Sequence, residues 1–173
     1  MAKVLMVIAP ANFKDEEYFG TRRILEEEGV EVDVANSTGK QSVSSRGKAA
    51  EVHIKLENVH DRDYDGIIFA GGSGSSFYFD YQIALDLVRK FFESGKLVGA
   101  ICIAPTILAR AGILNGKKAT AFTSQVDSIK SVATYTDKDV EQDGNIFTCK
   151  WPTVVPEFSR RVAEYLRGHG KPA

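Results

Sequence analysis

The chain has 173 residues and a formal net charge of −1, with 43% hydrophobic and 26% charged residues. These values predict one globular domain over residues 1–173, with an ordered core at about residues 3–167. The near-zero charge argues against nucleic acid or an acidic membrane surface as a partner. No apolar run approaches the roughly 20 residues of a membrane span, and the first residues lack the pattern of a signal peptide. The two cysteines do not make a disulfide framework, so we expect a cytoplasmic, reduced protein.

Strand and helix patterns alternate along the chain. The apolar run at residues 3–9 is typical of a strand buried on both faces of a parallel sheet. Residues 36–47 are rich in Ser and Gly and predict a loop. Further strands are expected at 30–35, 52–56, 65–70, 97–101, 119–122 and 146–149, and helices at 15–28, 80–93, 105–112 and 156–167. This order predicts an open, mainly parallel α/β sheet with helices on both faces.

In such sheets the ligand site lies beyond the carboxyl ends of the strands. Three predicted loops fall at that edge, at residues 10–17, 71–76 and 102–105. We therefore expect the functional residues there.

Cys102 ends the predicted strand at 97–101 and comes directly before a helix, because Pro105 suits a first helical turn. The residues two before and two after it, Ala100 and Ala104, are small, as a sharp strand-to-helix turn requires. This is the pattern of a nucleophile elbow with Cys in place of Ser. The helix dipole at this position favours a thiolate. The alternative is an inert core thiol.

Two further features of the same edge have a functional and a structural interpretation. Glu17 is either a solvated acid in a first helical turn or a carboxyl turned inward to exchange a proton with the thiol. Gly71 and Gly72 either make a plain tight turn or place a backbone N–H in the site. In the second case that N–H would form an oxyanion hole together with the N–H of Ile103. The glycine run lacks the lysine of a P-loop and the spacing of a dinucleotide fingerprint.

The remaining candidates carry weaker signals. The three histidines, at positions 53, 60 and 169, lie at no metal-ligand spacing, so we expect neither a metal nor a cofactor. Lys150 and Trp151 follow the last predicted strand. They either pack at the edge of the sheet or line the mouth of a pocket. Cys149 is interpreted as a buried structural thiol. The aromatic cluster at residues 77–81 is an interface patch, core packing or a pocket wall.

Four motifs in this order resemble the DJ-one/PfpI family of the class I glutamine amidotransferase-like superfamily. They are FKDEE at 13–17, DGIIFAGG at 65–72, AICIAP at 100–105 and AGILNGKK at 111–118. The resemblance covers nearly the whole chain, from Lys3 to Leu166. It implies a single-domain, doubly wound, flavodoxin-like α/β/α sandwich.

The resemblance also implies roles for individual residues. Cys102 matches the nucleophile, and Glu17 matches the acid because it lies four residues after Phe13. Gly72 and Ile103 match the backbone oxyanion donors. Arg46 and Lys150 match positions that are Arg in deglycase-like members, and Lys150 keeps the charge without the planar fork. A homodimer or a higher ring of dimers is implied as well.

Two positions depart from the protease-like members of that family. Ile103 occupies the position at which those members have a histidine. Ser76 matches the position of an acidic residue that, in those members, comes to the site from a neighbouring subunit. Both polar partners of a Cys-His-acid triad are therefore missing, and no adjacent imidazole can activate the thiol. The site resembles the branch that uses only Cys and Glu.

These features lead to one main hypothesis and three alternatives. The main hypothesis is a reactive Cys102–Glu17 site that acts on small reactive carbonyls such as α-oxoaldehydes, as glyoxalases and deglycases do. The first alternative is a stress-response redox sensor without turnover, in which Cys102 oxidises before Cys149. The others are an intracellular cysteine peptidase of PfpI type and a pseudoenzyme that keeps the fold.

Overall fold

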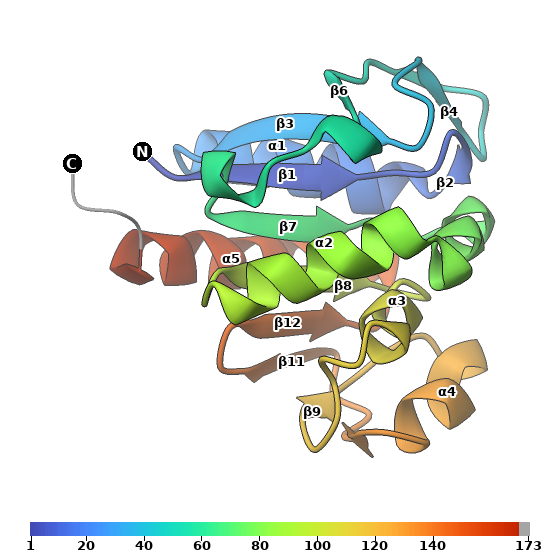
Figure 1. Ribbon diagram of the computed structural model, residues 1–173, viewed down its shortest axis with the longest axis vertical. Helices are drawn as coiled ribbons and strands as arrows, with labels where there is room; N and C mark the ends of the chain where they lie inside the picture. Colours follow the sequence, from blue (N-terminus) through green and yellow to red (C-terminus); the bar gives the residue numbers. More distant parts are fainter. Residues whose placement is uncertain (170–173) are drawn as a thin grey trace.

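A seven-stranded sheet runs through the middle of the computed structural model, which describes residues 1–169 (Figure 1). Its strand order is β11-β12-β8-β7-β1-β3-β6, and every neighbouring pair is parallel except β11 and β12. The strands of this sheet are β1 (Lys3–Val7), β3 (Glu31–Asn36), β6 (Ile54–Lys55), β7 (Gly66–Phe69), β8 (Leu97–Ile101), β11 (Val140–Asp143) and β12 (Ile146–Cys149).

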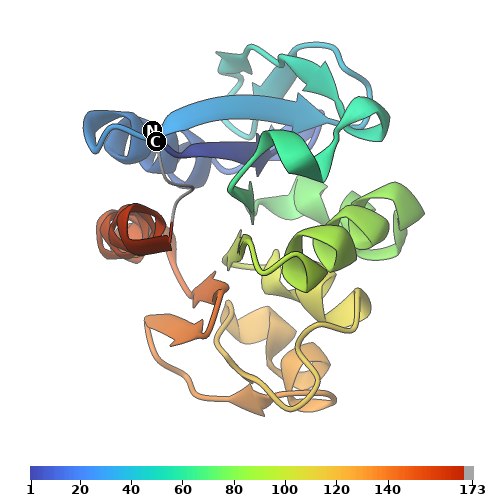
Figure 2. The same ribbon diagram turned by 60° about the vertical axis from the view of Figure 1, so that its left-hand side comes forward.

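Helices cover both faces of the sheet (Figure 2). One face carries α2 (Gln82–Glu93) and α3 (Pro105–Arg110), and the other carries α1 (Thr21–Glu27) and α5 (Val155–His169). The central strands β1, β7 and β8 are buried on both faces, and a separate apolar cluster fills the space under each helical layer. The predicted doubly wound α/β fold is confirmed.

Short elements complete the chain. They are α4 (Val126–Lys130), the 3-10 helices η2 (Leu56–Asn58), η3 (Asp61–Asp63), η4 (Ser73–Asp80), η5 (Thr123–Gln125) and η6 (Pro152–Val154), and the π-helix η1 (Glu16–Gly20). Within residues 1–169, no helix combines the length and the apolar character needed to cross a membrane.

Two sequence predictions about strands are wrong, and one edge strand of the main sheet was missed. The loop predicted at 36–47 contains β4 (Ser42–Ser44), which pairs with β2 (Ala11–Phe13) and β5 (Ala49–Ala50) in a small second sheet. The strand predicted at 119–122 is β9 (Lys118–Ala119), which pairs with β10 (Thr134–Tyr135) outside the main sheet. The edge strand β11 was not predicted. Each of these depends on pairing between segments distant in sequence, which a local pattern does not record.

The helix predicted at 15–28 is also not continuous. It opens with the π-helix η1 and becomes α-helical only from Thr21. The wider turn is anchored by Tyr18, which is fully buried and packs edge-on against Phe13 with ring centroids 5.4 Å apart. Because a π-helical turn holds more residues than an α-helical one, the side chains of this segment point differently from those of a regular helix.

The chain end and the aromatic cluster complete the comparison. The closing helix α5 continues to His169, two residues beyond the predicted core, and residues 170–173 lie outside the described residues. In the cluster at 77–81, Tyr78 belongs to the core and donates its hydroxyl hydrogen to the Ile8 carbonyl at 2.8 Å. Phe77 is 55% exposed. An interface role for Phe77 remains a prediction.

Candidate functional site

Cys102 occupies a strained turn between β8 and α3. Its φ is 63°, in the left-handed region that a side chain with a Cβ adopts at a cost of about 1–2 kcal/mol. Two hydrogen bonds hold the turn: the Cys102 N–H donates to the Cys149 carbonyl at 2.8 Å, and the Phe122 N–H donates to the Cys102 carbonyl at 2.7 Å. Ala100 and Ala104 are both fully buried, which explains why these positions are small. This backbone has the geometry of a nucleophile elbow.

Glu17 points inward from η1 and is 0% exposed. Its Oε1 accepts a hydrogen bond from the Gly71 N–H at 2.7 Å, while its Oε2 has no hydrogen-bond partner within the described residues. A buried carboxyl with one free oxygen is not the solvated acid of the alternative interpretation. It is placed to hold or transfer a proton.

The carboxyl and the thiol meet at Gly71. A Cβ at this glycine would lie 3.1 Å from the Cβ of Cys102 and 2.7 Å from the Ile101 carbonyl oxygen, and it would collide with Oε1 of Glu17. Glycine is therefore required at position 71 by close packing. The predicted loops at 10–17, 71–76 and 102–105 do come together at the carboxyl edge of the sheet.

Burial controls the protonation of this pair. Desolvation raises the pKa of Glu17 to about 7, and the hydrogen bond from Gly71 offsets only part of that effect. Desolvation also raises the pKa of Cys102 to about 12, and the nearby charge of Glu17 acts in the same direction. Only the Ile103 N–H and Lys14 oppose it. The expected thiolate is thus not favoured at rest, because burial and the nearby carboxyl both stabilise the protonated thiol.

Two backbone N–H groups are candidates for binding an oxyanion. The Gly72 N–H donates to no other atom of residues 1–169, and the Ile103 N–H interacts with the Cys102 sulfur itself. Gly72 has a φ of 100°, and a Cβ there would lie 2.5 Å from the Lys14 nitrogen, so this position also requires glycine. Gly72 follows Gly71, which packs against Cys102, and Ile103 directly follows Cys102 in the chain.

The other predicted pocket residues lie further out. Arg46 is exposed and pairs with Glu16 at 2.9 Å, and Ser76 is exposed and donates to the Ser73 carbonyl at 2.9 Å. Neither contacts Cys102 through a hydrogen bond or ion pair.

Lys150 and Trp151 contact the elbow only indirectly. Lys150 is buried, pairs with Asp137 and lies 4.6 Å from the centre of the Trp151 ring. The Trp151 ring packs edge-on against Phe122, whose N–H binds the Cys102 carbonyl. Trp151 therefore supports the elbow through Phe122, and neither residue forms a hydrogen bond or ion pair with the thiol.

Sequence reasoning missed the part that Cys149 plays at the elbow. Its carbonyl fixes the Cys102 backbone, and β8 and β12 place Ile101 opposite Cys149. The signal was present in the two predicted strands at 97–101 and 146–149, which end at the same edge. Their pairing as neighbours could not be inferred from the sequence alone.

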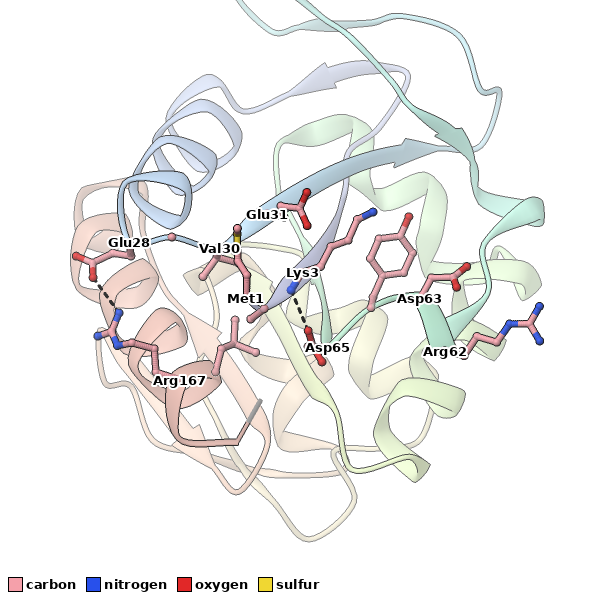
Figure 3. Close-up of a pocket in the computed structure, with 13 residues that line it drawn as sticks. Met1, Lys3, Glu28, Val30, Glu31, Arg62, Asp63, Asp65 and Arg167 are labelled. Atoms are coloured by element: carbon pink, nitrogen blue, oxygen red, sulfur yellow. Dashed lines mark hydrogen bonds and ion pairs between the residues drawn. The ribbon is translucent and has the colours of Figure 1, made fainter. Parts of the chain in front are cut away.

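The largest cavity is not at this site. It has a volume of about 680 Å³ and lies at the amino ends of the strands, where charged side chains of both signs line it (Figure 3). A second cavity of about 660 Å³ lies between η1 and the start of α5, beside Arg46 and Glu16. Among residues 1–169, no three His, Cys, Asp or Glu side chains are grouped so that they could hold a metal ion.

Comparisons with known proteins identify the class. The model of the DJ-1/PfpI family matches residues 2–165, and the chain therefore belongs to this family. The uncharacterized protein MJ0967 of Methanocaldococcus jannaschii is 40% identical over 95% of this chain and 82% of its own length. Protein dj-1beta of Drosophila melanogaster is 32% identical over 99% of this chain and 93% of its own.

Relatives with enzyme names and solved structures agree with this assignment. The deglycase PfpI of Pyrococcus furiosus and the glutathione-independent glyoxalase DJR-1.2 of Caenorhabditis elegans are each 27% identical, over 94% and 96% of this chain and 99% and 90% of theirs. A ThiJ/PfpI domain protein from Brachyspira murdochii has a TM-score of 0.93 at 26% identity, covering 96% of both chains. The structure of Drosophila DJ-1beta has a TM-score of 0.86 at 32% identity, covering 97% of this chain and 92% of its own.

Proposed function

We propose that this protein is a Cys–Glu enzyme that converts small reactive carbonyls, with α-oxoaldehydes such as methylglyoxal as the substrate class. The observation that carries the proposal is the fully buried Glu17 carboxyl, held by the Gly71 N–H beside a thiol in a strained elbow. Relatives named deglycase and glyoxalase support the same substrate class.

The proposed reaction begins with attack of the Cys102 sulfur on the aldehyde carbon. Glu17, whose pKa of about 7 suits a general base at neutral pH, takes the thiol proton as the C–S bond forms. The carbonyl oxygen becomes an oxyanion held by the Gly72 and Ile103 N–H groups, and protonation from Glu17 gives a hemithioacetal. The proton thus passes from sulfur to oxygen.

The same carboxyl can complete the conversion. Glu17 would move the aldehyde proton from the first carbon of the hemithioacetal to the second, and the hydroxyl proton would pass from the oxygen of the first carbon to that of the second, which turns the adduct into a thioester of a 2-hydroxy acid. Water would then hydrolyse the C–S bond and return the proton to sulfur. The balance is one α-oxoaldehyde and one water consumed for each 2-hydroxy acid formed, with no external oxidant or reductant.

Peptide hydrolysis is less well supported. Protonation of a leaving amine calls for an acid on the far side of the scissile bond, which in a Cys–His site is the imidazole. Ile103 is apolar, and the three histidines contact other parts of the fold: His53 accepts from the Val34 N–H, His169 stacks on Tyr165, and His60 is exposed beside η3.

The test is methylglyoxal consumption by the purified protein without glutathione. Wild type should consume it, Cys102→Ala should be inactive, and Glu17→Gln should lower kcat/KM by about 10²–10⁴-fold because it loses the proton acceptor. In wild type, kcat/KM should rise with pH through a pKa of about 7, and Glu17→Gln should lack this rise.

Glu16→Gln is the matched control. It removes one negative charge from the neighbouring residue, whose carboxylate binds the exposed Arg46. It should retain activity and the rise with pH, with the midpoint displaced slightly to lower pH because the Glu16 charge contributes to the raised pKa of Glu17. Equal consumption by wild type and Cys102→Ala, or none by either, would refute the proposed function.

A further inference from the structure

A second cysteine, Cys149, ends β12, the strand that pairs with β8 (Figure 1). The proposed carbonyl chemistry does not use it. Cys149 is fully buried, and its thiol donates to the Trp151 carbonyl at 3.5 Å. Both cysteines are free.

The backbone hydrogen bond between the two residues limits their separation. The Cys102 nitrogen lies 2.8 Å from the Cys149 oxygen. An amide nitrogen lies about 1.5 Å from its own Cα, and a carbonyl oxygen about 2.4 Å from its own Cα. Placed end to end, these lengths set an upper limit of about 6.7 Å between the two Cα atoms, within the roughly 4.4–6.8 Å that disulfides span.

The side chains also lie on the same side of the sheet. Cys149 belongs to the apolar cluster under α5, and Cys102 packs against that same cluster. A bond between the sulfurs therefore does not have to pass through the sheet. Bond formation would require the Cys149 thiol to release the Trp151 carbonyl, to which it now donates.

The difference in exposure between the two cysteines determines which of them an oxidant reaches first. Cys102 is partly exposed, whereas Cys149 is 0% exposed. A small oxidant meets Cys102 first, and Cys149 reacts only with a group already at the elbow.

We propose that Cys102 and Cys149 form a reversible disulfide when a hydroperoxide oxidises Cys102. In the first step the Cys102 sulfur attacks the peroxide, the O–O bond breaks, and the thiol proton leaves with the alcohol or water, so that Cys102 becomes a sulfenic acid. In the second step the Cys149 sulfur attacks the Cys102 sulfur, the S–O bond breaks, and the hydroxide leaves as water with the Cys149 proton. The peroxide gains the two electrons that the two thiols lose.

This reaction would protect the nucleophile. The second step is intramolecular and does not depend on peroxide concentration, whereas conversion of the sulfenic acid to sulfinic acid needs a second peroxide. The disulfide therefore dominates at low peroxide, and thiol reductants return both cysteines. The inference goes beyond the carbonyl activity and does not require it.

The experiment treats reduced protein with hydrogen peroxide, first equimolar and then in excess, and blocks free thiols before intact mass spectrometry. Wild type at equimolar peroxide should lose about 2 Da, the mass of the two hydrogens removed. A non-reducing digest should contain one linked pair of peptides, carrying Cys102 and Cys149, which dithiothreitol separates. Cys102→Ser should show no mass change.

Cys149→Ser keeps a hydroxyl that can donate to the Trp151 carbonyl. It should trap a sulfenic acid that dimedone labels, and at equal peroxide it should yield at least about tenfold more sulfinic acid than wild type, because no thiol competes. Equal sulfinic acid in wild type and Cys149→Ser, with no linked peptide, would overturn the proposal.

If Cys149→Ser does not fold, the linked peptide in wild type decides the question alone, since its absence at equimolar peroxide refutes the disulfide. Failure here is separable from failure of the proposed function. Methylglyoxal consumption under reducing conditions does not use the Cys149 thiol, and disulfide formation does not depend on carbonyl turnover.

Discussion

The two edges of the central sheet use their charged residues in opposite ways. At the amino edge, charged side chains that reach solvent line the cavity of about 680 Å³, among them Arg167 and Glu28, which form an ion pair (Figure 3). Lys3 also lines it and pairs with Asp33 outside the lining. At the carboxyl edge, one carboxyl is removed from solvent without a cationic partner and placed beside a thiol. The chemistry follows desolvation rather than cavity volume, because burial shifts the pKa of Glu17 into the range useful for catalysis.

The largest expected effect comes from adding one methyl group at the carboxyl edge. In Gly71→Ala the new Cβ would meet Glu17, the Ile101 carbonyl and Cys102 at once. We expect a loss of about 1–3 kcal/mol in the free energy of unfolding, as overpacking typically causes, and a fall in kcat/KM of about 10²-fold or more. Urea denaturation and the methylglyoxal assay measure the two effects.

Gly29→Ala at the amino edge is the matched control for this variant. Gly29 has a φ of 83° and no atom within 4 Å of the position of a new Cβ, so alanine there strains only the backbone, by about 1–2 kcal/mol. We expect similar instability but full activity. Equal loss of activity in both variants would mean that general destabilisation, not the packing around Gly71, accounts for the result.

The sequence predicted the elbow because its signals are local. An apolar strand, two alanines and Pro105 all fall within about ten residues of Cys102, and the structure places each in the expected element. Glu17 was ambiguous from its own surroundings, since an acid in a first helical turn is usually solvated. Only the resemblance singled it out, and the π-helical turn that aims it inward has no sequence signature that local reasoning detects.

The protonation state of the thiol could not be predicted from the elbow pattern. The helix-dipole argument favours a thiolate, but α3 has only six residues and Cys102 is largely desolvated beside an acid. Burial and the proximity of Glu17 are properties of the assembled sheet. They outweigh the local dipole, which acts over a single turn.

The next largest effect is a contrast in how stability depends on pH. The pKa of Glu17 is raised from 4.5 to about 7, so the folded state binds more protons than the unfolded state between these values. Wild type therefore loses stability as pH rises through this window, by about 3 kcal/mol. Glu17→Gln should lack this loss, so its stability relative to wild type should improve by about that amount from pH 4 to pH 8 in urea denaturation.

Asp33, beside the amino-edge cavity, should behave in the opposite way. Partial burial acts to raise its pKa, but hydrogen bonds from Tyr64 and Lys3 lower it overall. The stabilisation of the fold by the Asp33 carboxylate is present above pH 3.8 and is lost as the pH falls below that value. Asp33→Asn should thus be less stable than wild type near pH 7, by less than about 1 kcal/mol, and the difference should narrow by pH 3. The same direction of change in both variants would contradict the contrast between the edges.

The smallest effect is expected where the charges are most exposed. Arg167 and Glu28 lie 3.0 Å apart with side chains 55% and 36% exposed, so water and salt already screen their attraction. Arg167→Ala should change the free energy of unfolding by no more than about 0.5 kcal/mol and leave methylglyoxal consumption and its pH profile unchanged. Thermal and urea denaturation at low and high salt measure the first quantity. A loss of more than about 2 kcal/mol, or any loss of activity, would show that the amino edge is coupled to the site. An exposed ion pair by itself does not contribute that much to stability.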